Sequence, residues 1–235
     1  MDTTPTFSIC HATARVPDGW IKSWYSWASN ATNPLISEYI LSVHKDHEAA
    51  LMERLRKGIP ISNGLRPRIA IYATRRCSVD NWNYAAACSV GDIIILNADD
   101  FFPPPLWDIE LLNGLQKAGK SIKDEFVIHV GTGNPDQAWE NRLIPLAIMS
   151  RPVYERWGGY ALYPAYESVV SDDDFTEHAY QDGLVIEMRH LVFEHRHPCF
   201  GKAQYDDVYR HQNRPEALQL GQMLLQQRRN RRFCS

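Results

Sequence analysis

GDIIILNADDFFPPP, residues 91–105, is the stretch of this sequence that decides the fold. Residues 92–96, DIIIL, are nearly all apolar, as expected for a strand buried in a parallel sheet. The strand leads to two adjacent carboxylates, Asp99 and Asp100, at the end where α/β sheets bind ligands. Adjacent carboxylates repel each other unless a divalent cation neutralises them and bridges to phosphate oxygens. The segment therefore indicates a metal–diphosphate site, with a turn-capping Asp pair as the structural alternative.

Strand and helix patterns alternate on both sides of this segment. Apolar runs predict strands at 6–11, 37–43, 68–74, 125–130 and within 184–193. Helical patterns predict helices at 19–30, 48–57, 79–88, 107–119 and from 171. Trp20, Trp24 and Trp27 recur at helical spacing and predict an aromatic stripe packed in the core. The alternation predicts an α/β fold with a Rossmann-like, mostly parallel, twisted sheet flanked by helices.

The composition is that of one ordinary globular domain. The chain has 235 residues, of which 44% are hydrophobic and 23% charged, and its formal net charge is −3. No global charge points to a nucleic-acid partner. We predict a domain over residues 1–205, followed by a C-terminal helix and basic tail over residues 206–235.

The cysteines and the N-terminus predict a soluble, cytoplasmic protein. The five cysteines are scattered, without the spacing of a zinc site or of a disulfide framework, which fits a reducing compartment. The N-terminal sequence lacks a signal peptide, and no stretch approaches the roughly 18 apolar residues of a membrane span.

Three segments give the chain a resemblance to the family 2 glycosyltransferases of GT-A fold, including phage and bacterial types. They are SICHATAR at 8–15, SVDNWNYAAACSVGDIIILNADD at 78–100 and SDDDF at 171–175. The resemblance extends over residues 6–200 and rests on the order and spacing of these elements. It implies a nucleotide-diphospho-sugar transferase fold and transfer of a hexose or pentose from a nucleotide-sugar, with a UDP-sugar as the default donor.

The resemblance assigns roles to the residues around the strand tip. Asp99 and Asp100 correspond to the ligands of Mn²⁺ or Mg²⁺ and of the donor diphosphate, in a motif similar to Asp-x-Asp. Asn97 stands where many members have the first Asp of this motif, which removes one charge from the site. Asn83 and Asp80 are candidates for nucleotide contact, with helix capping as the alternative.

Two loops are predicted to hold the nucleotide. By the same resemblance, the loop containing Ala12, Thr13 and Arg15 passes under the nucleotide. Asp46 or His44, after the second strand, would reach the base or the ribose.

The acidic run SDDDF is the candidate source of a catalytic base. Inverting transfer needs a carboxylate to take the proton from the acceptor hydroxyl as it attacks the anomeric carbon. Family members carry a catalytic acidic residue here, and Asp172 and Asp173 are preferred over Asp174. Neighbouring carboxylates also raise each other's pKa. The alternative is a solvated first turn that complements the helix dipole.

The segment FEHRHPCFGK, residues 193–202, brings two imidazoles together after a strand. His195 and His197 lie two residues apart, so on an extended segment they point to the same side. The resemblance favours one of them as a further ligand of the divalent metal, over a zinc site or a structural role. Lys202 would offset charge on the leaving group.

The acceptor is the part of the reaction that the sequence identifies least. Two acceptors stay open: a glycan, or a modified DNA base as for some phage-encoded transferases, since the terminal QQRRNRRF would steer the enzyme to a polyanion. Two other functions share the acidic pattern. A nucleotidyltransferase should have a Gly-rich loop after the first strand, which HATAR is not, and a non-catalytic nucleotide-binding module would bind without turnover.

Overall fold

The computed structural model describes residues 6–33, 37–60 and 64–233. Seven of its strands form one sheet in the order β3-β2-β1-β4-β7-β6-β8. Their bounds are β1 Phe7–Ala12, β2 Ser37–His44, β3 Pro67–Tyr72, β4 Ile93–Asn97, β6 Val127–Gly131, β7 Ile148–Ser150 and β8 Val185–Val192. A separate two-stranded ribbon pairs β5 (Phe101–Phe102) with β9 (Glu194–His195).

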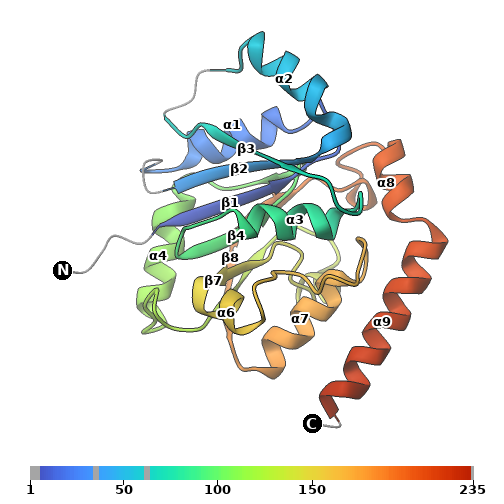
Figure 1. Cartoon of the computed structure of the whole chain (residues 1–235). Helices are drawn as coiled ribbons and strands as arrows, with labels where there is room; N and C mark the ends of the chain where they lie inside the picture. The colour runs from blue at the N-terminus through green and yellow to red at the C-terminus, as the bar shows by residue number, and fades with distance from the viewer. Residues whose placement is uncertain (1–5, 34–36, 61–63, 234–235) are drawn as a thin grey trace.

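Helices cover both faces of the sheet (Figure 1). They are α1 Ile21–Asn30, α2 Glu48–Arg56, α3 Ser78–Ala87, α4 Trp107–Lys117, α5 Gln137–Glu140, α6 Arg151–Arg156, α7 Ser171–Gln181, α8 Asp207–Gln212 and α9 Pro215–Phe233, with 3-10 helices η2 Lys45–His47 and η3 Pro198–Phe200. None of the helices in the described part of the chain is both long and apolar enough to cross a bilayer.

The central strands show why this sequence makes a layered fold. Ile93 and Ile95 of β4 belong to one buried cluster, and Ile94 and Leu96 belong to the other. Successive side chains of a strand point to opposite faces, so an uninterrupted apolar run supplies both clusters. The predicted α/β fold with a mostly parallel sheet is confirmed; only β7 runs antiparallel to its neighbours β4 and β6.

The predicted tryptophan stripe is confirmed as core. Trp20, Trp24 and Trp27 are all buried, with exposed fractions of at most 1%. Trp27 packs edge-to-face against Trp107 of α4, with ring centroids 5.0 Å apart. This contact joins α1 to α4 on one face of the sheet.

The strand order places the ligand-binding edge. β1 pairs in parallel with both β2 and β4, and His11 lies beside Asn97 in the register. The chain therefore changes direction across the sheet between β1 and β4, and such a switch point opens a crevice at the carboxyl ends of the strands.

The β5–β9 ribbon returns a late segment to this same edge. Phe101 is paired with His195, and the backbone N–H of Arg196 donates to the carbonyl of Asp100 at 2.8 Å. Segments almost a hundred residues apart in sequence are thereby joined next to the tip of β4.

The described cysteines Cys10, Cys77, Cys88 and Cys199 are free thiols, and Cys234 lies outside the described residues.

Candidate active site

A cavity of about 670 Å³ lies at the carboxyl ends of β1 and β4. Its walls come from the loop after β1, the tip of β4, the start of α3, the start of α7, the β9 segment and α8. The volume is in the range of small-molecule sites. Of the predicted residues, the ones that line it are Ala12, Thr13, Arg15, Asp99, Asp100, Asp172, His195 and His197.

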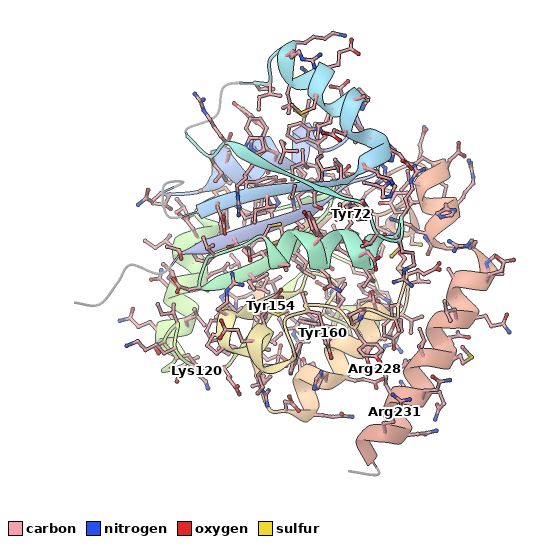
Figure 2. The ribbon with its side chains drawn as sticks, viewed as in Figure 1. Tyr72, Lys120, Tyr154, Tyr160, Arg228 and Arg231 are labelled. Carbon is pink, nitrogen blue, oxygen red and sulfur yellow. The ribbon has the colours of Figure 1, made fainter. Side chains whose placement is uncertain are left out.

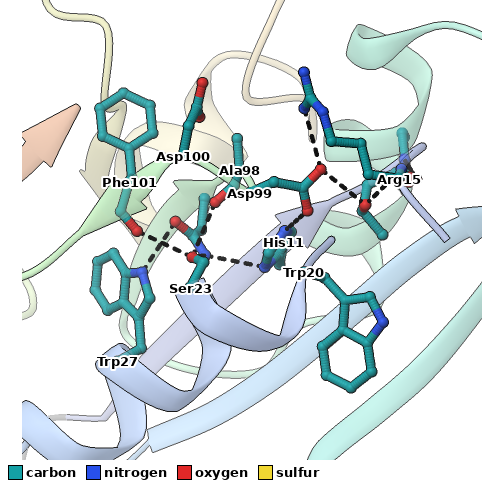
Figure 3. A network of polar contacts seen from close by, with 12 residues as sticks. His11, Arg15, Trp20, Ser23, Trp27, Ala98, Asp99, Asp100 and Phe101 are labelled. Carbon is teal, nitrogen blue, oxygen red and sulfur yellow. Dashed lines mark hydrogen bonds and ion pairs between the residues drawn. The ribbon is translucent and has the colours of Figure 1, made fainter. Parts of the chain in front are cut away.

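Asp99 is held by residues of β1 and the loop that follows it. Its Oδ1 lies 2.8 Å from His11 Nε2, and its Oδ2 accepts from Thr13 Oγ1 at 3.0 Å and from Arg15 Nη1 at 3.3 Å. Figure 3 shows the carboxylate turned toward His11 and Arg15. Because its side chain is only 6% exposed, Asp99 is a fixed acceptor at the cavity wall.

Asn97 lies beneath Asp99 and is fully buried. The indole N–H of Trp27 can only donate, so its 3.0 Å contact identifies the Asn97 oxygen and orients the amide. The Asn97 nitrogen, which carries two hydrogens, then faces three acceptors, Ser23 Oγ and Tyr39 OH at 3.0 Å and His11 Nδ1 at 3.1 Å.

This orientation fixes the state of the His11 ring. Because Nδ1 accepts from Asn97, the proton of a neutral His11 is on Nε2, where it is donated to Asp99. Tyr39 OH also contacts Nδ1 and can donate to it. A buried chain of hydrogen bonds therefore runs from Trp27 through Asn97 and His11 to Asp99 (Figure 3).

Asp100 faces the other side of the cavity. Its Oδ2 lies 3.4 Å from His195 Nε2 and accepts a hydrogen bond from the hydroxyl of Tyr209 on α8. Burial alone would raise the pKa of this carboxyl, but the hydrogen bond and charge of His195, together with the Tyr209 hydroxyl, outweigh burial and lower the pKa to about 2. Asp100 is thus a carboxylate at neutral pH.

The start of α8 makes a second contact with the candidate site. Asp206 accepts from Arg15 Nε at 2.6 Å and from Arg15 Nη2 at 3.2 Å. The Arg15 guanidinium also lies over the Tyr209 ring, 4.4 Å from its centroid. α8 therefore contacts both Arg15 and Asp100.

The three aspartates of the acidic run at the start of α7 have different surroundings. Asp172 lines the cavity, and burial, with the charge of Asp173, raises its pKa to about 6. Asp173 does not line the cavity, and burial also raises its pKa. Asp174 faces α9 and is bonded to Arg228. Of the two candidates, the structure brings Asp172 to the strand tips.

The two histidines of the β9 segment lie side by side as predicted, with ring centroids 5.0 Å apart. His195 stacks on Phe101, and its Nε2 faces Asp100. Burial and the neighbouring His195 lower the pKa of His197 to about 4, and the Nδ1 of His197 accepts from the backbone N–H of Cys199. Within residues 6–33, 37–60 and 64–233, no three His, Cys, Asp or Glu side chains converge as a ready-made metal cluster.

Besides the buried Asn97, four of the residues predicted to contact the donor do not line the cavity. Asp46 is ion-paired with His44, and Asp80 with Arg75. The Asn83 side chain bonds the backbone of residues 161 and 162. Lys202 lies 3.4 Å from Glu194 and from the Gly133 carbonyl. In this structure each of these side chains is used in a structural contact outside the cavity.

Other residues line the cavity without having been predicted. Asn81 is 4% exposed and donates from Nδ2 to the Thr13 carbonyl at 3.3 Å. Its Oδ1 has no partner among the described residues. Tyr209 also lines the cavity. Asn81 carried a sequence signal, because it lies two positions from Asn83 in the same segment, whereas Tyr209 carried none.

Comparison with known proteins identifies the fold. No protein-family model matches the chain, and no curated protein matches it. S. aureus TarS is similar in structure over 80% of this chain and 36% of its own, with a TM-score of 0.60 at 13% identity. The mannosyltransferase PcManGT from Pyrobaculum calidifontis, solved with GDP-Man and Mn²⁺, is similar over 82% of this chain and 57% of its own, with a TM-score of 0.56 at 14% identity.

A third match is glucosyl-3-phosphoglycerate synthase from Mycobacterium tuberculosis, solved with Mg²⁺ and UDP. Its TM-score is 0.53, over 82% of this chain and 72% of its own, at 11% identity. The chain has the GT-A fold of these proteins. It spans little more than a third of TarS and under two thirds of the mannosyltransferase.

Proposed function

We propose that this chain is a glycosyltransferase that moves a hexose or pentose from a nucleotide-sugar to an acceptor hydroxyl, with inversion at the anomeric carbon. One observation carries the proposal: the GT-A cavity holds Asp99 and Asp100 at the tip of β4 and Asp172 at the start of α7. Asp100 and Asp172 come from distant parts of the sequence and differ in pKa, as the different tasks of a transferase require.

The donor nucleotide would bind against the loop after β1 and the start of α3. Arg15 and Thr13 provide donors for phosphate or ribose oxygens, and Asp99 accepts from a hydroxyl. Asn81 Oδ1 is a buried acceptor without a partner among the described residues, so it fits an N–H or O–H of the nucleoside. A UDP-sugar is the first donor to test, since a match of this fold was solved with UDP.

The residues present fit a divalent cation that completes its coordination with substrate oxygens. Asp100 and His195 line the cavity with Oδ2 and Nε2 only 3.4 Å apart, and Mg²⁺ commonly takes one or two protein ligands plus phosphate oxygens. Such an ion, Mn²⁺ or Mg²⁺, would supply charge stabilisation to the diphosphate leaving group. Asp100 and His195 would hold it, and His197 is the neighbouring imidazole.

Asp172 is the proposed general base. Its carboxyl has a pKa of about 6, so at neutral pH it is mostly ionised and still basic enough to take the proton of an attacking hydroxyl. Apolar side chains such as Ile144 and Phe175 share its part of the cavity wall and limit the access of water.

A glycan is the acceptor that the charge distribution favours over a modified DNA base. Arg228 and Arg229 of the basic tail are paired with Asp174 and Glu177, so part of its positive charge is neutralised within the protein. Nucleic-acid binding depends on unneutralised cations that displace counterions.

The test is a panel of UDP-, GDP-, dTDP- and CDP-sugars with and without Mn²⁺, followed by thermal shift and by release of nucleoside diphosphate. We expect one donor to stabilise the protein and to be slowly hydrolysed in a metal-dependent manner. Asp100→Ala should abolish this response. Asp18→Ala is the matched control, because Asp18 is 63% exposed, pairs with Arg54 and does not line the cavity.

The outcomes separate the candidate functions. If no nucleotide-sugar binds at any metal concentration, the transferase proposal fails. Binding without hydrolysis or transfer to any acceptor would favour a non-catalytic module, and release of pyrophosphate from a nucleoside triphosphate would favour a nucleotidyltransferase. Transfer to a DNA oligonucleotide but not to glycans would reverse the proposed choice of acceptor.

A further inference from the structure

We propose that the C-terminal helix α9 positions the Asp172 carboxylate, by clamping the strained turn that precedes it and the helix that carries it. The inference rests on the proposed function, because it concerns the residue assigned as the base. It gives α9 a role inside the transferase rather than as a basic arm for a polyanion.

The turn before α7 has a backbone that its sequence disfavours. Val170 has φ of 72°, in the left-handed region, although it is β-branched and only 8% exposed. Such a conformation is unfavourable for a β-branched residue and persists only where the surroundings enforce it. Asp172 follows two residues later, so its direction depends on this turn.

Gly221 of α9 packs directly on the turn. A Cβ at position 221 would lie 2.8 Å from the Val169 carbonyl oxygen and 2.9 Å from Val170 Cβ. Only glycine allows this approach, since any other residue would push backbone atoms apart. The helix therefore covers the strained turn at the point where Val169 also lines the cavity.

A second set of contacts fixes the far side of the α7 N-terminus. Arg228 Nε lies 2.9 and 2.8 Å from the two carboxylate oxygens of Asp174, whose side chain is 4% exposed. The Arg228 guanidinium also covers the Tyr163 ring, 3.7 Å from its centroid. Arg228 lies at the interface of α9 with the body of the protein, as Figure 2 shows.

These two anchors lie on either side of Asp172 in the sequence. Gly221 holds residue 170 and Arg228 holds residue 174, while Arg229 binds Glu177 one turn further along α7. A carboxylate fixed from both sides keeps one direction into the cavity, and a displacement of about 1 Å at a reacting group can lower a rate about 100-fold. Gly221 and Arg228 are thus positioning residues, which act through α7.

The experiment compares two glycine-to-alanine changes in helices. Gly221→Ala places a methyl against backbone, whereas Gly114→Ala in α4 places one 2.4 Å from the flexible end of Met188, which can move. Both changes raise the intrinsic helix propensity by the same amount, since each replaces a helical glycine with alanine. With the donor that the nucleotide-sugar panel identifies, we expect Gly221→Ala to lower kcat about 10- to 100-fold with the donor KM unchanged, and Gly114→Ala to leave both within about twofold.

Arg228→Gln and Arg231→Gln form a second pair if Gly221→Ala fails to fold. Arg231 lies on the same helix, labelled in Figure 2, but is exposed. Arg228→Gln should lower kcat and move the acid limb of the kcat–pH profile, while Arg231→Gln should change neither. If the wild-type protein binds no donor, the proposed function is refuted. An active wild type whose kcat survives both Gly221→Ala and Arg228→Gln would refute this inference alone.

Discussion

Replacing Asn97 with Asp introduces the residue that many members of the family this sequence resembles have at this position, and we expect it to destabilise this protein. Asn97 is fully buried, and its nitrogen faces Ser23, Tyr39 and His11. An aspartate would put an oxygen in place of that nitrogen, facing the lone pair of His11 Nδ1 at 3.1 Å. The Tyr39 hydroxyl can rotate to donate, but the Ser23 hydroxyl already donates to the carbonyls of Ala98 and Phe101, and the neutral ring with its proton on Nε2 cannot donate from Nδ1.

The magnitude follows from the burial. A buried charge left without a compensating partner costs about 3–5 kcal/mol. For a chain of this size, 1 kcal/mol corresponds to about 2–4 °C, so a loss of about 4 kcal/mol predicts a fall of about 8–16 °C in Tm. Urea unfolding gives the free energy of unfolding, and tryptophan fluorescence can follow it because Trp27 is part of the hydrogen-bond network.

Asn134→Asp is the matched control for Asn97→Asp. Asn134 accepts through Oδ1 from the backbone N–H of Asp136, and an aspartate accepts equally well there. We expect its stability to stay within about 0.5 kcal/mol of wild type. If Asn97→Asp unfolds at the same urea concentration as wild type, the assigned direction of the hydrogen bonds from Trp27 to Asp99 is wrong.

Two further substitutions test the cavity. Tyr209→Phe removes the hydroxyl that donates a hydrogen bond to Asp100. A hydrogen bond to a charged group is worth about 1.5–3 kcal/mol, and only part of this energy would become available to a metal, so Mn²⁺ in the presence of UDP should bind about 3- to 10-fold more tightly by calorimetry. Weaker binding would make Tyr209 a partner of the metal rather than its competitor. Asp172→Asn should lower kcat about 10²- to 10⁴-fold and leave donor binding intact. The pKa of Asp172 in the folded state is raised to about 6, so the wild-type protein loses stability as this carboxyl ionises. Asp172→Asn should therefore be more stable than wild type above about pH 6 but not below about pH 4. An unchanged kcat would show that another residue is the base.

The sequence predicted the frame of the molecule because that frame depends on local patterns. The apolar run in β4 supplies both core clusters, and the helical spacing of Trp20, Trp24 and Trp27 predicts a buried face of α1. The antiparallel direction of β7 was not predicted, because a strand of three residues carries no local sign of its direction. Its direction depends on tertiary context, because β7 lies between β4 and β6 and pairs with both.

The site was predictable where its residues follow a strand, as Asp99 and Asp100 do, or belong to a segment that carries the resemblance, as Asp172 does. The positions of Asp99 and Asp100 follow from the end of β4. Whether Asn81 or Asn83 faces the cavity depends instead on the rotation of α3 about its axis. Residues two apart on a helix lie about 200° apart, so one faces the cavity and the other faces residues 161–162. No pattern of spacing fixes that rotation, which is set by tertiary packing.

The contribution of α8 was invisible for a different reason, because it is a contact between distant segments. Asp206 pairs with Arg15 across 191 residues, and Tyr209 reaches Asp100 across 109. Neither residue type signals a partner so far away in sequence. The predicted C-terminal appendage of residues 206–235 therefore includes one wall of the cavity.

The two α8 contacts bear on how a donor would enter. Arg15 is bonded to a carboxylate of α8 and Asp100 to a hydroxyl of α8, so each group that would serve a diphosphate or its cation already has a partner. A diphosphate can compete with Asp206 for Arg15 because both present anionic oxygens, and a cation can compete with the Tyr209 hydroxyl for Asp100. Neither exchange alone frees α8, because the other contact still holds it. Metal and nucleotide should therefore bind cooperatively, each making the displacement of α8 easier for the other.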